Sequence, residues 1–161
     1  MRVYHGTILE IMHPEVGYTR SNLDFGPGFY VTTYKDQAEK WAIRKSLRKP
    51  KGTEKAIVNE YEVDDLGIYT VKKFADADSE WLHFVCDARN GIEVYKGFDV
   101  IIGNVADDEV MKCVRMYMRG IWDEKRTLDE MVYYKQNDQM AVPSQKVIDE
   151  AFHFVGSYEV K

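Results

Sequence analysis

The chain has 161 residues, of which 45% are hydrophobic and 30% charged, and its formal net charge is −5. This length is typical of one domain, so we expect residues 1–161 to form a single domain, and the apolar content excludes a disordered protein. The negative charge argues against general binding to the nucleic-acid backbone, for which a basic surface is typical. No stretch is apolar enough to cross a bilayer and no signal-peptide pattern is present, so we expect a cytoplasmic protein that does not contact membranes.

The N-terminal part of the chain predicts two strands followed by a helix. Short alternating patterns predict strands at 1–8 ("MRVYHGTI") and 28–33 ("GFYVTT"). Thr33 stands three residues before Asp36, which is the spacing of a capping box, and it therefore predicts that a helix begins there.

Two further strands are expected at 55–63 ("KAIVNEYEV") and 68–74 ("IYTVKKF"), separated by the turn "DDLG". Because strands joined by so short a turn usually pair with each other, we expect these two to form a hairpin.

The C-terminal part mixes helices and strands. Apolar residues at helical spacing, with acidic or serine starts and a glycine stop, predict helices at 76–91 and 105–120. The apolar run "FDVIIG" at 98–103 is typical of a central strand that is buried on both faces. Thr127 and Glu130 form a second capping-box pattern that predicts a short helix. The remaining expected elements are a strand at 139–142, a helical turn or two from 145, and a strand at 153–160. This mixture has no regular β-α-β repeat and predicts an α+β fold with a split, mostly antiparallel sheet and flanking helices.

Cysteine, histidine and acidic residues do not form a recognisable metal motif. Cys86 and Cys113 lack partners at short spacing and are expected in the core, and His83 with Cys86 would make only half of a zinc site. Most acidic clusters lie at turns or helix starts, where carboxylates stabilise the helix dipole. One alternative is a metal-dependent hydrolase built on Asp99, Asp107 and Asp108.

The segment "LDFGPGFY" at 23–30 does not match a phosphate-binding loop. In such loops the glycines follow a strand and open a helix, whereas Gly26 and Gly28 precede a strand, and Pro27 between them has no N–H to donate. We therefore expect these glycines to let the chain turn and approach a flat group beside Tyr30.

Four segments occur together in a distinctive order. They are "YHGT" at 4–7, "GFYVTT" with the following "A..WA" helix, "FDVIIG", and "NDQMAV" at 137–142. This combination resembles the ADP-ribosyltransferase superfamily, specifically a group of short bacterial members, over nearly the whole chain. The resemblance implies a split-sheet core of the ADP-ribosyltransferase type and the use of NAD as a substrate, without a metal.

The resemblance also implies roles for individual residues. His5 would bind the adenosine-side ribose of NAD, and the backbone of Gly6 would hold the nicotinamide amide, with Thr7 completing the motif. Tyr30 would stack on the nicotinamide ring, and Gly28 belongs to the same NAD-binding motif. The matching residues of the helix are Ala38, Trp41 and Ala42.

Gln139 stands where the superfamily has a glutamate that opens a late strand. Cleavage of the nicotinamide glycosidic bond develops positive charge on the ribose, as glycoside hydrolysis does. A neutral amide can orient a ribose hydroxyl but cannot stabilise that charge, so we expect no growth of poly-ADP-ribose chains. The neighbouring Asp138 would point to the opposite side of a regular strand.

The leading hypothesis is a mono-ADP-ribosyltransferase that transfers ADP-ribose from NAD to a macromolecule, with His5, Tyr30 and Gln139 as its catalytic residues. Two alternatives are a catalytically weak module that binds NAD or ADP-ribose, and an NAD glycohydrolase. Small members of the superfamily are often toxins or phage-defence effectors, which implies an antitoxin or another regulatory protein as a partner.

Positive residues provide candidate contacts for anions. Arg20 is either a ligand of the NAD pyrophosphate, whose oxygens fit a guanidinium, or an ordinary exposed arginine. The basic segment 44–55 is either a solvated helix end or a surface that faces an anionic target. Because the net charge is negative, we expect the ADP-ribose acceptor to be a protein rather than a nucleic acid.

Overall fold

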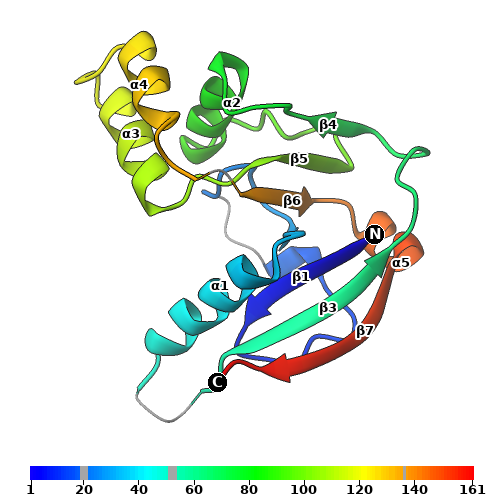
Figure 1. Cartoon of the computed structure of the whole chain (residues 1–161). Coiled ribbons are helices and arrows are strands. Elements are labelled where there is room, and N and C mark those ends of the chain that lie inside the picture. Colours follow the sequence, from blue (N-terminus) through cyan, green and yellow to red (C-terminus); the bar gives the residue numbers. More distant parts are fainter. Residues whose placement is uncertain (19–21, 51–53, 136) are drawn as a thin grey trace.

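The computed structural model describes residues 1–18, 22–50, 54–135 and 137–161, and the strands of this part of the chain form two sheets (Figure 1). The first sheet contains, in spatial order, β1 (Arg2–Thr7), β3 (Ile57–Val63) and β7 (Phe152–Glu159). The second contains β2 (Phe29–Val31), β6 (Asp138–Val142), β5 (Val100–Asn104) and β4 (Val71–Lys73). Neighbouring strands are antiparallel except β4 and β5, which are parallel. The expected α+β class with mostly antiparallel sheets is therefore confirmed.

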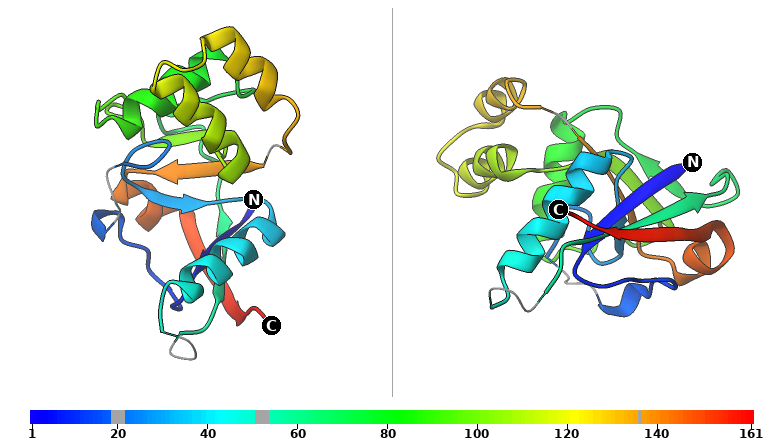
Figure 2. Two further views of the ribbon diagram at one scale, coloured as in Figure 1. Left: turned by 90° about the vertical axis from the view of Figure 1, so that its left-hand side faces the viewer. Right: turned by 60° about the horizontal axis from the view of Figure 1, so that its bottom comes forward.

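Helices flank both sheets. They are α1 (Lys35–Leu47), α2 (Ser79–Arg89), α3 (Asp108–Met118), α4 (Glu124–Met131) and α5 (Gln145–Ala151), and a short 3-10 turn covers Val16–Tyr18. Figure 1 shows α1 along the first sheet and α2, α3 and α4 together outside the second. The left panel of Figure 2 shows this layering from the side, with the second sheet between the group of three helices and the first sheet.

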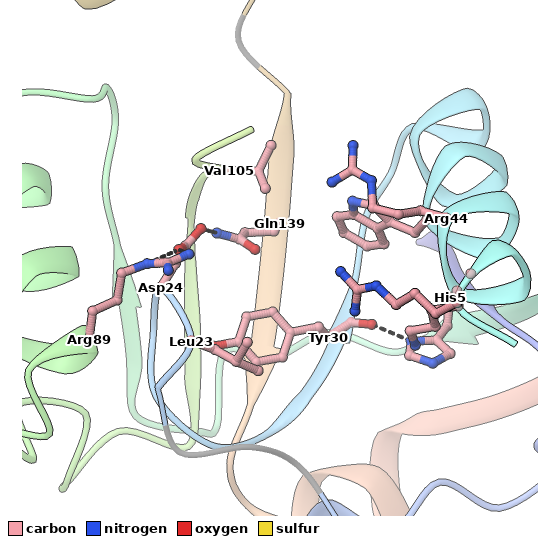
Figure 3. A pocket seen from close by; sticks show the side chains of 12 residues that line it. His5, Leu23, Asp24, Tyr30, Arg44, Arg89, Val105 and Gln139 are labelled. Atoms are coloured by element: carbon pink, nitrogen blue, oxygen red, sulfur yellow. Dashed lines mark hydrogen bonds and ion pairs between the residues drawn. The ribbon is translucent and has the colours of Figure 1, made fainter. Parts of the chain in front are cut away.

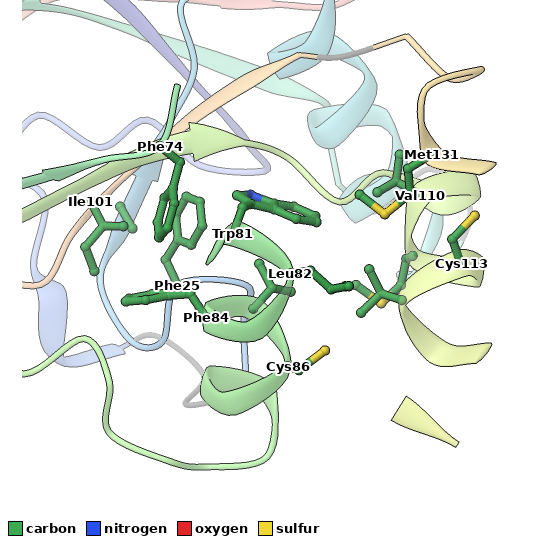
Figure 4. Close-up of a cluster of buried hydrophobic side chains, with 14 residues drawn as sticks. Phe25, Phe74, Trp81, Leu82, Phe84, Cys86, Ile101, Val110, Cys113 and Met131 are labelled. Carbon is green, nitrogen blue, oxygen red and sulfur yellow. The ribbon is translucent and has the colours of Figure 1, made fainter. Parts of the chain in front are cut away.

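Each interface between layers has its own apolar cluster. Trp81, Leu82 and Phe84 of α2 pack against Phe25 and Ile101 beneath the helices (Figure 4). A second cluster fills the space between the two sheets, and a third lies between α1 and β3. Burying one large apolar side chain contributes about 1.5–3 kcal/mol, so these three clusters hold the layers together.

The strand β5 is buried on both faces, as its apolar run predicted. Val100 belongs to the cluster between the sheets, whereas Ile101 faces the helices, and neither side chain is exposed. Cys86 and Cys113 are buried under α2 and α3, which confirms the expected core positions.

Helix α1 lies unusually close to β1 because Gly6 has no side chain. A Cβ atom built on Gly6 would lie 1.9 Å from the carbonyl oxygen of Ala38 and 2.8 Å from the backbone nitrogen of Ala42. The glycine of "YHGT" and the alanines of the "A..WA" pattern therefore have a common packing reason.

The two sheets meet at a single β-bridge between Tyr4 and Thr32 in the described part of the chain. The N–H of Tyr4 donates to the Thr32 carbonyl at 2.8 Å, and the N–H of Thr32 donates to the Tyr4 carbonyl at 3.0 Å. This bridge places the end of β1 beside β2, so that His5 and Tyr30 become neighbours.

The expected hairpin between 55–63 and 68–74 is wrong. β3 lies at the centre of the first sheet, where β1 and β7 already occupy both of its edges, and β4 instead joins the second sheet beside β5. No edge of β3 is free to pair with the following strand, so the chain crosses to the other sheet.

Both capping boxes are also wrong. The residue that precedes α1 is Tyr34, and the hydroxyl of Thr33 donates to Asp138 at 2.5 Å. Asp123 caps α4 by accepting from the N–H of Arg126 at 2.8 Å, which leaves Thr127 inside the helix. Asp138 also accepts from the backbone N–H of Thr33 at 2.9 Å, which is the hydrogen bond that the capping box expects Asp36 to accept. At α4 the cap lies at Asp123, four residues before Thr127, so the helix begins earlier than expected.

Candidate functional site

A cleft of about 360 Å³ lies between α1 and the strands β1, β2 and β6. Four of the residues expected from the sequence line it, namely His5, Gly6, Tyr30 and Gln139. In Figure 3 Gln139 lies above the Tyr30 ring, and His5 lies to the right of that ring. Residues from three strands of two different sheets therefore converge on one site.

His5 is held as a neutral imidazole with a defined tautomer. Its Nδ1 lies 2.6 Å from the carbonyl oxygen of Tyr30, and because a carbonyl only accepts, Nδ1 carries the proton. The imidazole ring also packs against the ring of Phe29, with 4.5 Å between the two ring centroids. Burial, with a contribution from the charge of Lys45, lowers the pKa of His5 to about 3. At neutral pH its Nε2 is therefore a hydrogen-bond acceptor.

Tyr30 fastens the glycine loop with its hydroxyl group. The hydroxyl donates to the carbonyl oxygen of Gly26 at 2.6 Å and accepts from the N–H of Phe25 at 3.1 Å. Burial raises the pKa of Tyr30, so the hydroxyl remains protonated. The ring itself lines the cleft, which leaves an aromatic face for a flat ligand.

The glycines of this loop are required by close contacts. Gly26 has φ +78°, and a Cβ there would lie 2.2 Å from the ring of Tyr95. A Cβ on Gly28 would lie 2.9 Å from the backbone of Val142, so this glycine lets β2 approach β6. Gly28 is not among the residues that line the cleft. The close contact of Gly28 is therefore with strand β6 and not with the cleft.

A buried ion pair lies beside Gln139, and sequence reasoning missed it. Asp24 is 5% exposed and its Oδ1 accepts from Arg89 Nε at 2.8 Å and from Nη2 at 2.5 Å. Its Oδ2 accepts from the side-chain nitrogen of Gln139 at 3.0 Å and from the N–H of Ala106 at 3.1 Å. Figure 3 shows this group at one side of the cleft. No local pattern in the sequence marks these contacts, because they join residues that are 65 and 115 positions apart.

Cations from the last turns of α1 line the other side of the cleft. They are Arg44, Lys45 and Arg48, and Trp41 lies on the same helix and also lines the site. Burial and the charge of Arg48 lower the pKa of Lys45 to about 8, so it remains mostly charged at neutral pH. The helical part of the basic segment 44–55 thus faces a cavity, while residues 51–53 lie outside the described part of the chain.

The other expected residues lie elsewhere. Thr7 is buried on β1 without lining the cleft, and Arg20 lies outside the described residues. Asp138 points away from Gln139, as strand alternation predicted, and its carboxylate accepts from Thr32 Oγ1 at 2.8 Å and from Thr33 N at 2.9 Å.

Among the described residues, no group of three histidine, cysteine, aspartate or glutamate side chains is arranged to hold a metal ion. The three carboxylates of the hydrolase alternative have separate partners, which are Thr70 N for Asp99, Val110 N for Asp107 and Arg44 for Asp108. His83 lies 3.0 Å from a Glu124 oxygen. No helix in the described ranges is both long and apolar enough to span a membrane.

Comparison with known proteins assigns the chain to a family. A family model with the description "Protein of unknown function (DUF3990)" matches residues 1–154. No match was found among curated proteins or solved structures. The matched segment includes β1, β2, β6 and α1, and with them every described residue that lines the cleft. The chain therefore belongs to the DUF3990 family.

Proposed function

We propose that the protein binds NAD in the cleft, breaks its nicotinamide glycosidic bond and transfers the ADP-ribose to a macromolecule. The observation that supports this best is the convergence of His5, Tyr30 and Gln139 on one cleft from three separate strands. They occupy the three positions to which the resemblance to the ADP-ribosyltransferase superfamily assigns catalytic roles, with glutamine in place of glutamate at position 139.

The reaction needs few chemical groups from the protein. The bond between C1′ of the ribose and the nicotinamide nitrogen breaks, and its electron pair leaves with neutral nicotinamide. The ribosyl group becomes cationic until a nucleophile of the acceptor attacks C1′ and loses its proton to solvent. The protein must therefore fix the riboses, hold the leaving ring and orient the hydroxyl beside C1′.

The residues of the cleft suit these tasks. The neutral imidazole of His5 accepts a hydrogen bond from a ribose hydroxyl through Nε2. The faces of Tyr30 and Trp41 suit a planar nicotinamide. Gln139, which lines the cleft above the Tyr30 ring in Figure 3, provides an amide for the ribose nearest the bond that breaks.

The cations of α1 suit the pyrophosphate of NAD. Lys45 and Arg48 lie on the helix that also carries Trp41, and guanidinium and ammonium groups form strong charge-assisted hydrogen bonds to phosphate oxygens. We assign them this role in addition to Arg20, whose role is implied by the sequence alone. The acceptor is a protein in this proposal, because the net charge of −5 disfavours nucleic acid. A role as a toxin or phage-defence effector with a regulatory partner follows from the resemblance.

A second candidate is a module that binds NAD or ADP-ribose without turnover. One observation favours it: Gln139, to which we assign the reacting ribose, is a neutral amide, and the carboxylate of Asp24 that it contacts is paired with Arg89. Little negative charge then remains to stabilise a ribosyl cation.

The experiment follows free nicotinamide by NMR and adds labelled NAD to a cell lysate. We expect release and a labelled macromolecule with the wild type, and neither with His5→Ala. The matched control is His153→Ala on β7, because His153 is an exposed histidine that pairs with Asp64 and does not line the cleft. EDTA should change nothing.

Each outcome separates the candidates. Release without labelling identifies an NAD glycohydrolase, and saturable NAD binding without release identifies the binding module. A wild type that does not bind NAD at millimolar concentration contradicts both proposals.

A further inference from the structure

The side-chain amide of Gln139 is buried and faces acceptors on one side. Gln139 is 3% exposed, and its Nε2 lies 3.0 Å from Asp24 Oδ2 and 3.4 Å from the carbonyl oxygen of Asn104. An ionised carboxylate and a carbonyl can only accept, so the NH₂ group must face both of them. The amide oxygen is thereby directed away from this pair of acceptors.

The hydrogen bonds of Asp24 explain why its carboxylate stays available as an acceptor. Arg89 occupies Oδ1 with two N–H groups, whereas Oδ2 is left to Gln139 and to the N–H of Ala106. All of these partners donate. Rotating the Gln139 amide by half a turn would bring its oxygen to about 3 Å from Oδ2 and would leave a buried acceptor unpaired, which is costly.

We propose that Asp24 is a positioning residue, which holds the Gln139 amide so that only its oxygen is presented to the ligand, as the acceptor for a ribose hydroxyl. This inference rests on the proposed function. In this arrangement the oxygen of Gln139 accepts the hydrogen bond that a carboxylate at position 139 would accept. The nearest carboxylate, that of Asp24, lies behind the amide and is paired with Arg89.

The arrangement makes a specific demand on position 139. A glutamate there would place two carboxylates at about the distance that now separates the Gln139 nitrogen from Asp24 Oδ2, which is 3.0 Å. Two such groups cannot both be ionised without strong repulsion. Glutamate should therefore be tolerated only when Asp24 is replaced by a donor.

The test is an exchange of the two groups. Gln139→Glu alone should weaken NAD binding at least about tenfold, and Asp24→Asn alone should weaken it several-fold, because the asparagine side chain no longer dictates which end of the amide faces the ligand. The double variant Asp24→Asn/Gln139→Glu restores one donor facing one acceptor at this contact but leaves the N–H of Ala106 without its carboxylate acceptor. It should therefore bind NAD at least about threefold more tightly than Gln139→Glu without reaching the affinity of the wild type. Asp138→Asn is the matched control, since it removes the adjacent carboxylate, which points away from Gln139.

A pH profile separates positioning from a purely structural effect. The Gln139→Glu variant should regain NAD affinity, relative to the wild type, as the pH falls from about 7.5 to about 5.5, because a protonated glutamate donates to Asp24 and presents its carbonyl oxygen. A merely loosened fold would not recover in acid. The double variant should show no such recovery.

Measurements without ligand keep the inference apart from the proposed function. The same four proteins give a double-mutant cycle for urea unfolding, in which we expect a coupling of about tenfold in the unfolding equilibrium constant. Additive effects, or a double variant that binds NAD no better than the poorer single variant, overturn the inference. If the coupling is present but the wild type does not bind NAD, the orientation of the amide is supported and the proposed function is refuted.

Discussion

Replacing Tyr30 by phenylalanine separates the two tasks of this residue. The change removes the hydroxyl but keeps the ring that lines the cleft. The hydroxyl lies 2.6 Å from the Gly26 carbonyl oxygen and 3.1 Å from the Phe25 nitrogen, and both of those residues are buried. Leaving a buried polar group without a partner costs about 1–3 kcal/mol. Because Tyr30 is only half-buried and water reaches the site, we expect a total loss of about 2 kcal/mol rather than the sum of two full penalties.

Urea unfolding provides the measurement, with an unchanged m-value as the sign that only stability differs. The matched control is Tyr69→Phe, which removes an exposed hydroxyl that donates to Glu150 at 2.9 Å and should cost less than about 0.5 kcal/mol. In NAD titrations Tyr30→Phe should lose affinity only a few-fold, whereas Tyr30→Ala should lose more than about tenfold. Equal stability of Tyr30→Phe and the wild type would refute the fastening of the loop, and unchanged NAD binding by Tyr30→Ala would refute the aromatic face.

Three further predictions concern the loop and the two titrating groups of the cleft. Gly26→Ala should destabilise the fold more than Gly91→Ala. Both glycines have a positive φ, but a Cβ at Gly26 would lie 2.2 Å from the Tyr95 ring, whereas one at Gly91 would meet nothing within 4 Å. Equal losses of unfolding free energy in urea would contradict this. The pKa of His5 is about 3 in the folded protein and 6.5 in the unfolded chain, so the unfolded chain is protonated first as the pH falls. The free energy of unfolding should therefore decrease below pH 6.5, by about 2 kcal/mol at about pH 5. His5→Gln should remove this part of the pH dependence, and an identical dependence in the variant would contradict the burial of a neutral ring. Lys45 loses its charge as the pH rises through its pKa of about 8, so ADP-ribose should bind several-fold more weakly at about pH 9 than at about pH 7, and Lys45→Arg should show a nearly flat profile in calorimetry.

The elements that could be predicted from sequence are those whose pattern is local. Helices α2 and α3 follow from apolar residues at helical spacing, and in both a preceding aspartate accepts from an N–H three residues on. The buried strand β5 follows from an uninterrupted apolar run. In these segments each residue's environment is decided mainly by its near neighbours in the chain.

The errors arose where distant residues compete with near ones. The strand that follows β3 would pair with it if an edge were free, but β1 and β7 come from the two ends of the chain and cover both edges. The capping box at Thr33 fails because the distant Asp138 accepts from both its hydroxyl and its backbone N–H, and the latter was expected to pair with Asp36. No local pattern shows that a residue over a hundred positions away provides the stronger partner.

The candidate site divides in the same way. His5, Tyr30 and Gln139 stand in short motifs, and the sequence could therefore single them out. The contacts of Asp24 with Arg89 and Gln139 span the chain, and a lone aspartate before a glycine loop gives no sign of them. The sequence left open whether the cations of α1 form a solvated helix end or face an anion, because the other elements that build the cavity are distant in the chain.

The cations of the cleft also have a kinetic consequence. The whole chain carries a net charge of −5, whereas Lys45 and Arg48 concentrate positive charge inside the site. An anionic nucleotide that comes within a Debye length of about 10 Å of the outer surface is repelled by the net negative charge, and it meets the attractive cations only on entry to the cleft. Added salt should therefore speed its arrival and also shorten its residence, so that the affinity changes less with ionic strength than either rate constant does.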